Sequence, residues 1–435
     1  MRDKRLAKTT MVIFLALVLA VIPILAACAR GEAVKPPVEH EIKIGFLYDL
    51  TAGVASQSMP IHLAAIDYLK YVNTEKGGVE GYPVKHLWRD TRSDVAITIG
   101  GYKAFKEQGV VNFVVGGSPA LPALASYFEQ DQIACLAMAQ NPTLMFPPRW
   151  YYQLSPNPPE MVASWVDWAI KEGTWADPAK KKVAIMYVAG SYGNAIFQGG
   201  TQYLQAVGVE VVAKEEVAYI PLSVKAELER IRARKPDYLL LIGTFPVGVT
   251  TLREMNEIGY KLPVVGFSGL APTDILQSLK PELVEGYSFL SCYAETPDLE
   301  GTFVRELWNK NHPPAEWNTI SAFMYGLTVN CVSLTLDCVK KAITAVGIEN
   351  LNGAAVKKYG WDTVKGFKPI VGDFTFNIQP GVDNRASDWM RIQQVKGGKI
   401  VDATPWKHTP TVWSQGVVSD PSGRVKPGNW TDILK

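Results

Sequence analysis

Residues 42–48 read IKIGFLY and residues 61–74 read IHLAAIDYLKYVNT, and this pair of segments decides the fold. The first is a short apolar run of the kind that forms a buried strand. In the second, apolar residues recur at helical spacing from Ile61 to Val72, which predicts a helix with one buried face. Pro60 stands at the start of this helix, where a missing N–H is tolerated, and Gly77-Gly78 ends it.

The same strand–helix unit recurs in two runs. Further strands are expected at Val84–Trp88, Val111–Val115, Ile133–Ala137, Val183–Val188, Val209–Val217, Tyr238–Ile242, Leu262–Phe267 and Gly286–Tyr293. Helices are expected at Asp94–Glu107, from Pro119, at Asn194–Val207, at Lys225–Arg234, and at residues 247–258, 298–311 and 318–346. Residues 141–159 hold six of the 29 prolines and mark a passage between lobes. The alternation predicts an α/β fold with parallel sheets and helices on both faces. The tail adds a hairpin, Met390–Val395 with Lys399–Val401.

The N-terminal segment indicates export. Residues 1–8 are basic, and an apolar run from Met11 to Ala27 is short for a membrane-spanning helix. The run ends in Leu25-Ala26-Ala27-Cys28, which resembles a bacterial lipobox in which the cysteine takes the lipid. The alternative is an ordinary signal peptide with a chance cysteine. We therefore expect residues 1–28 to be a lipoprotein signal peptide ending at Cys28, and residues 29–40 to be a tether.

Composition and motifs argue against several function classes. The chain has 44 basic and 42 acidic residues, a net charge of +2, and no clustered basic face for nucleic acid. It contains no G-x-x-x-x-G-K-[ST] loop, and its five histidines form no zinc-binding pair, so we expect no metal site and no cofactor. Residues 266–270, GFSGL, nearly match the G-x-S-x-G motif of hydrolases, but Leu270 replaces the second glycine. We expect no enzymatic activity.

The cysteines beyond Cys28 are few. Cys331 and Cys338 lie seven residues apart in an apolar helical stretch. Two helical turns separate them by about 10.5 Å, too far for a disulfide, which needs Cα atoms within roughly 7 Å. We interpret both as small buried apolar residues. A bond between Cys135 and Cys292 is left open.

An ordered set of short motifs resembles the periplasmic leucine/isoleucine/valine-binding proteins of ABC transporters. The motifs are Ile42-Lys43-Ile44-Gly45, Gly77-Gly78-Val79-Glu80-Gly81, Asp90, Gly116-Gly117-Ser118, Asn141-Pro142, Ser191-Tyr192-Gly193, Ala322–Gly326 and Gly372-Asp373-Phe374-Thr375-Phe376. The resemblance covers about residues 41–400. It implies a type I binding-protein fold, with two Rossmann-like lobes, three hinge crossings and a ligand cleft between the lobes. Lobe 1 would comprise residues 41–157 and 293–368, and lobe 2 residues 158–292 and 369–435.

The same resemblance implies a function. The chain would be a monomeric, extracytoplasmic solute-binding lipoprotein, anchored to the cell envelope, that delivers a small organic ligand to ABC permease subunits by hinge closure. A ligand-sensing receptor or regulator of the same fold is the alternative.

Candidate ligand-binding residues follow from the rule that open α/β sheets bind ligands beyond the carboxyl ends of their strands. Ser118 at a helix start suits an anion, and the resemblance assigns this loop to a ligand carboxylate, although Ser118 could simply cap its own helix. The resemblance also points to the loop after the fourth strand and to further positions. The full set is Ser118, Ala137, Met138, Ala139, Gln140, Tyr192, Thr244, Phe245, Ser268 and Gln57, with Ser56 as an alternative to Gln57.

Ser268 bears on the ligand class. Amino-acid binders of the family carry a glutamate after this strand for the ligand ammonium, but here the segment is Gly266-Phe267-Ser268-Gly269-Leu270. An amine buried without a charged partner would be costly. Asp274 lies six residues away and is expected in the next helix. The sequence therefore favours an acid without an α-amino group, aromatic or aliphatic, with an amino acid as the alternative.

Overall fold

A computed structural model describes much of the chain. The described residues are 40–51, 55–116, 121–138, 140, 144, 148–172, 174–175, 177–267, 269–378, 384–410, 412–414, 417–418 and 428–429. Ile42–Lys435 form one compact unit, distinct from Met1–Glu41. Cys28 and the tether lie outside the described residues, so lipidation remains a prediction.

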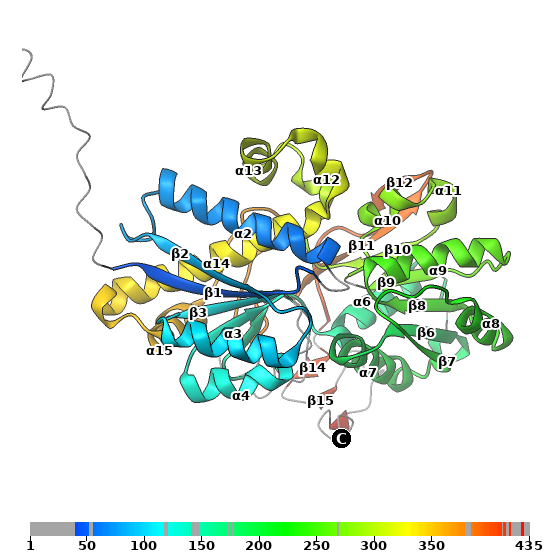
Figure 1. Cartoon of the computed structure of the whole chain (residues 1–435). Helices are drawn as coiled ribbons and strands as arrows, with labels where there is room; N and C mark the ends of the chain where they lie inside the picture. The colour runs from blue at the N-terminus through cyan, green and yellow to red at the C-terminus, as the bar shows by residue number, and fades with distance from the viewer. Residues whose placement is uncertain are drawn as a thin grey trace, which may run out of the picture. The chain divides into compact units, whose positions relative to one another are not determined.

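The first sheet is parallel, with strand order β2-β1-β3-β4-β5 (Figure 1). Its strands are β1 (Ile42–Tyr48), β2 (Val84–Asp90), β3 (Asn112–Gly116), β4 (Ala134–Ala137) and β5 (Tyr151–Gln153). Every residue of β3 and β4 is buried, as expected for parallel strands that are covered on both faces. The first four strands agree with the predicted ones to within a few residues at each end.

Helices cover both faces of this sheet. On one face α2 (Ala55–Glu75) lies beside α14 (Ala322–Val346), which returns from far along the chain, while α3 (Val95–Glu107) and α4 (Leu121–Asp131) cover the other face (Figure 1). Asp94 caps α3 by accepting a hydrogen bond from the Ile97 N–H at 2.8 Å. In the described part of the chain, α14 alone is long and apolar enough to cross a membrane. Because 89% of its apolar window is buried, α14 is a core helix.

The second sheet has the strand order β12-β11-β10-β9-β8-β6-β7, and β13 pairs with β11. The five neighbouring strands β10, β9, β8, β6 and β7 are mutually parallel. Strands β11, β12 and β13 join the sheet in antiparallel pairings. The parallel strands are β6 (Lys182–Val188), β7 (Glu210–Val217), β8 (Tyr238–Ile242), β9 (Val264–Phe267) and β10 (Ser288–Ser291). The others are β11 (Trp389–Lys396), β12 (Lys399–Asp402) and β13 (Lys407–His408). The predicted hairpin is therefore confirmed.

Two pairs of helices pack on the second sheet: α6 (Pro158–Lys171) contacts α7 (Ser191–Ala206), and α8 (Lys225–Ala233) contacts α9 (Phe245–Glu257). The remaining α-helices are α10 (Pro272–Ser278), α11 (Pro281–Val284), α12 (Thr296–Leu299), α13 (Phe303–Asn311) and α15 (Gly353–Ala355). Short 3-10 and π turns are η1 (Pro178–Lys180), η2 (Pro314–Thr319), η3 (Ile348–Asn350), η4 (Val356–Gly360) and η5 (Trp361–Thr363). A small sheet joins β14 (Trp413–Ser414), β15 (Val417–Val418) and β16 (Gly428–Asn429).

Segments that connect the two large sheets meet one another. The Gln153 N–H at the end of β5 donates to the Asn384 carbonyl at 3.3 Å, and the Ala386 N–H donates to the Gln153 carbonyl at 2.7 Å. A strand end of the first sheet is thus paired with the segment that leads into β11 of the second. The lobe boundaries given above remain a prediction.

The prolines produced two differences from the sequence-based prediction. Helix α2 begins at Ala55, so Pro60 lies inside the helix and the prediction that it starts there was wrong. Pro60 falls early in α2, where its missing N–H removes one intrahelical bond close to an end that lacks such bonds anyway. Helix α6 was missed, because Pro158 and Pro159 were taken as breakers. They occupy the first helical turn, and the Asn157 N–H donates to Glu160 Oε2 at 3.1 Å.

The four described cysteines are buried and free. Cys331 and Cys338 are fully buried, which confirms their interpretation as small apolar residues. Cys135 and Cys292 do not form the bond that the sequence left open.

Candidate functional site

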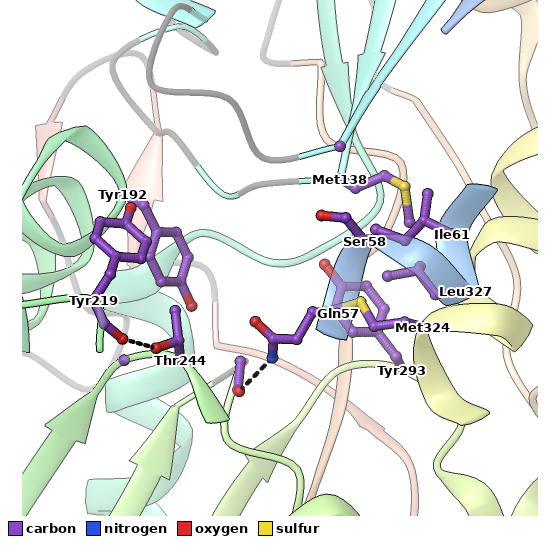
Figure 2. Close-up of a pocket in the computed structure, with 13 residues that line it drawn as sticks. Gln57, Ser58, Ile61, Met138, Tyr192, Tyr219, Thr244, Tyr293, Met324 and Leu327 are labelled. Carbon is purple, nitrogen blue, oxygen red and sulfur yellow. Dashed lines mark hydrogen bonds between the residues drawn. The ribbon is translucent and has the colours of Figure 1, made fainter. Parts of the chain in front are cut away.

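A pocket lies where strands of both large sheets reach their carboxyl ends (Figure 2). Gly116 ends β3 and Met138 follows β4 in the first sheet. Tyr219 follows β7, Gly243 follows β8 and Gly269 follows β9 in the second. Two sheets therefore present strand ends to one cavity, which is the position where open α/β sheets bind ligands.

One wall of the pocket is mainly apolar. Ile61 from α2, Met138 after β4, and Met324 and Leu327 from α14 line it, and Figure 2 shows their side chains gathered on one side. The methionine thioethers are flexible and polarisable, so this wall can adapt to the shape of an apolar guest. Tyr293, in the segment that follows β10, lies on the same side.

The opposite wall is aromatic and polar. Tyr192 lies in the first turn of α7, and Figure 2 shows it beside Tyr219, facing the apolar wall across the cavity. The Thr244 hydroxyl donates to the Tyr219 carbonyl at 2.8 Å, which ties the loop after β7 to the end of β8. Rings with one polar end offer both contact area and a hydrogen-bonding group.

Gln57 reaches across between the walls (Figure 2). It comes from the first turn of α2, and its Nε2 donates to the Gly269 carbonyl at 3.1 Å. A Cβ on Gly269 would lie 2.6 Å from the Gly243 carbonyl oxygen, so only glycine brings these two strand ends so close. The result is one hydrogen bond from an element of the first sheet to a strand end of the second.

The described lining residues carry no formally charged side chain. Burial raises the pKa of the Tyr219 hydroxyl, with a further contribution from Asp49. Burial also raises the pKa of Tyr293 well above its ordinary value, and Cys292 adds to this shift. Both phenols therefore stay protonated at neutral pH and can donate hydrogen bonds. The described lining offers neutral donors and acceptors beside an apolar wall.

Four of the predicted site residues line this pocket: Gln57, Met138, Tyr192 and Thr244. Phe245 lines a neighbouring cavity instead. Ligand contact by any of these residues remains a prediction.

Other predicted residues lie elsewhere or cannot be placed. Ala137 is buried at the end of β4 and is not in the lining. Gln140 is also buried outside the lining, with Nε2 at 3.3 Å from the Met161 sulfur. Ser118, Ala139 and Ser268 lie outside the described residues, as do the positions 117–120 of the proposed carboxylate loop.

Sequence reasoning missed most of the lining. Tyr219 could have been predicted from the rule of strand ends, because it comes two residues after β7. Met324 and Leu327 gave no local signal, since only the return of α14 to the first sheet brings them to the cavity. The remaining missed residues are Ser58, Ile61, Gly116, Gly243, Gly269 and Tyr293.

Comparison with known proteins identifies relatives of this arrangement. The model of a family described as "Periplasmic binding protein" matches residues 41–399. No curated protein sequence matches the chain significantly.

Solved structures share the fold at low sequence identity. A branched-chain amino acid ABC transporter protein from Thermus thermophilus, with bound valine, has a TM-score of 0.75 and 18% identity over 85% of this chain and 97% of that one. A fatty acid ABC transporter substrate-binding protein from Thermomonospora curvata has a TM-score of 0.70 and 18% identity over 85% and 93%. A Streptococcus pneumoniae branched-chain amino acid substrate-binding protein, in complex with isoleucine, has a TM-score of 0.66 and 15% identity over 85% and 100%.

Proposed function

Because the chain belongs to the periplasmic binding protein family, we propose that it captures a small organic acid in the pocket between its two sheets and delivers it to an ABC importer. The family and the type I fold are those of non-enzymatic, extracytoplasmic solute-binding proteins. The observation that carries the proposal is the pocket itself, which strand ends of both sheets line. A guest held there contacts both walls, so its binding energy favours their approach.

The composition of the lining supports an acid without an α-amino group. A buried ammonium needs a carboxylate or several strong acceptors, and the described lining holds no acidic side chain. The apolar wall around Met138 and Met324 suits an aliphatic chain or an aromatic ring. The ligand carboxylate would lie toward the helix that Ser118 begins, as the family resemblance implies. The fatty acid protein from Thermomonospora curvata shows that the fold is also used for such guests.

Export and anchoring complete the proposal. The family implies an extracytoplasmic location, and the lipobox ending at Cys28 would hold the protein on the cell envelope. Replacing Cys28 by serine should move the protein from the membrane fraction to the soluble one. Lipid labelling of both proteins is measured in parallel. Retention of the C28S variant in the membrane fraction, together with no lipid label on either protein, would contradict the anchor.

Calorimetric titration tests the ligand class. We expect octanoate or benzoate to bind at least about tenfold more tightly than leucine or valine, because the unpaired α-ammonium would lose more than about 1.4 kcal/mol on burial. Tight binding of leucine together with no heat from either acid would contradict the proposed class. Mass spectrometry of ligand released from the native protein gives an independent identification.

A further inference from the structure

A second cavity adjoins the pocket, and we call it the Asp274 compartment. Its lining residues are Gln57, Phe245, Asp274, Gln277, Ser278, Asn318, Thr319, Ile320 and Ser321. Gln57 is the residue that the two described linings share, so the pocket and the compartment adjoin at this residue. The compartment differs from the pocket in chemistry, because it contains a carboxylate and many neutral oxygen atoms.

Asp274 is the feature of the compartment that needs an explanation. It lies in α10 and is 6% exposed. Its Oδ2 accepts a hydrogen bond from the Ser321 hydroxyl at 2.5 Å, but its Oδ1 is buried and has no partner among the described residues. Burial raises the pKa of Asp274 to about 7, although the bond from Ser321 acts in the opposite direction. Asp274 lines the compartment, and within the described part of the chain its buried carboxylate oxygen lacks the hydrogen-bond donor that such a group normally has.

A second buried acid lies close to Asp274. Glu295 is fully buried nearby, and its pKa is raised well above its ordinary value, first by burial and then by Asp274. The Arg391 guanidinium acts on the pKa of Glu295 in the opposite direction, but it already pairs with Asp298 and lies 3.1 Å from Asp402. No basic side chain lines the compartment among the described residues. The described lining therefore supplies no positive charge that could pair with Asp274.

We propose that the Asp274 compartment is a subsite for a primary ammonium group carried at the distal end of the ligand. The inference rests on the proposed function, because the apolar body and the carboxylate of this ligand occupy the adjoining pocket. The ammonium donates to the free Oδ1 of Asp274. Neutral oxygens of Asn318, Thr319 and Gln277 can accept its remaining hydrogen bonds.

The position of Gln57 favours a group that arrives with the ligand over a free inorganic cation. Its amide group donates to the Gly269 carbonyl, and the residue lines both cavities. A ligand that extends past Gln57 would reach from the pocket into the compartment. A ligand with a charged end on each side of an apolar body would then contact both cavities at once, and one carboxylate matches the single charge of an ammonium.

Matched pairs of ligands test the proposal. Octanoate is compared with 8-aminooctanoate, and benzoate with 4-(aminomethyl)benzoate, by calorimetry at pH 8. In the full-length protein we expect the amino group to strengthen binding by at least tenfold in one of the pairs. D274N should abolish that gain while it leaves octanoate and benzoate within about twofold. E282Q removes one negative charge from an exposed position in α11 and serves as the control, with the gain retained.

A second measurement keeps the test independent of the acids. The carboxyl carbon of Asp274 is observed by NMR, assigned by its loss in D274N, while n-butylammonium or sodium ions are added. A shift caused by n-butylammonium and not by sodium supports the subsite even if no acid binds, which would overturn only the proposed function. An equal response to sodium overturns the assignment to an ammonium group. The inference is overturned if the amino group weakens binding equally in the wild type and in D274N and n-butylammonium causes no shift. Binding of octanoate or benzoate in that case leaves the proposed function intact.

Discussion

Removal of the Asp274 charge should change stability in a way that depends on pH. The stability of the D274N variant relative to the wild type should be greater at pH 8 than at pH 4. The substitution D274N keeps the shape of the side chain and an oxygen that can accept the hydrogen bond from Ser321. It removes the only ionisation that this side chain can undergo. The effect on stability should therefore depend on pH in a direction that the burial of Asp274 fixes.

The sign follows from proton linkage. Burial raises the pKa of Asp274 from 3.8 to about 7 in the folded protein, so the unfolded chain loses this proton at lower pH. Between about pH 4 and pH 7 the folded state binds more protons than the unfolded state, and the stability of the wild type falls as pH rises. Over these three pH units, the free energy of unfolding of the wild type falls by at most about 4 kcal/mol through this group. Glu295, whose pKa is raised in part by Asp274, acts in the same direction.

Differential scanning calorimetry can measure the effect. Unfolding of Ile42–Lys435 carries an entropy of about 0.8 kcal/mol per kelvin. The difference in melting temperature between D274N and the wild type should thus grow by as much as about 5 °C from pH 4 to pH 8. E282Q, which alters an exposed acid, should show no such trend. A constant difference between D274N and the wild type across this range would refute the assignment of a strongly raised pKa to Asp274.

Two further predictions concern the pocket, and a third concerns the start of α7. Y192A should weaken binding of the tightest acid by about 5- to 100-fold, because a ring of the polar wall is lost; calorimetry checks this, and unchanged affinity would remove Tyr192 from the site. Q57A should weaken binding by about 2- to 10-fold, the worth of one hydrogen bond, whereas Q108A at an exposed helix end should have no effect. G193A should lower the free energy of unfolding by more than about 2 kcal/mol, since its Cβ would lie 1.7 Å from the Val188 carbonyl oxygen; a denaturant titration that shows wild-type stability would contradict the geometry at the start of α7.

The strands could be predicted from the sequence because burial on both faces leaves a direct compositional trace. Tyr238–Ile242 reads YLLLI, and both its existence and its ends agree with β8. The short strand Tyr151–Gln153 was missed, since three residues among prolines carry no periodicity that separates them from a loop. Pairing of β5 with β4 depends on contacts across the sheet, and a single sequence does not record these.

The site was predictable only where it follows strand ends. Met138 and Thr244 lie within two residues of predicted strands, and both reach the pocket. Tyr293 and Leu327 reach it through the packing of segments that are far apart in the sequence. Asp274 could be placed in a helix from the sequence, but its burial beside a cavity depends on the approach of Ser321 from the start of α14.

Hinge closure requires that the protein alone holds its two walls together only weakly. Within the pocket, the described contact between an element of the first sheet and a strand end of the second is the bond from Gln57 to the Gly269 carbonyl, worth about 1 kcal/mol. A ligand shifts an equilibrium between open and closed forms only by its difference in affinity for the two. An octanoate-sized guest that touches Met324 on one wall and Tyr192 on the other makes about half of its contacts only when the walls meet. Those contacts exceed one hydrogen bond several-fold, so in the proposed mechanism the ligand, and not Gln57, determines which form the importer encounters.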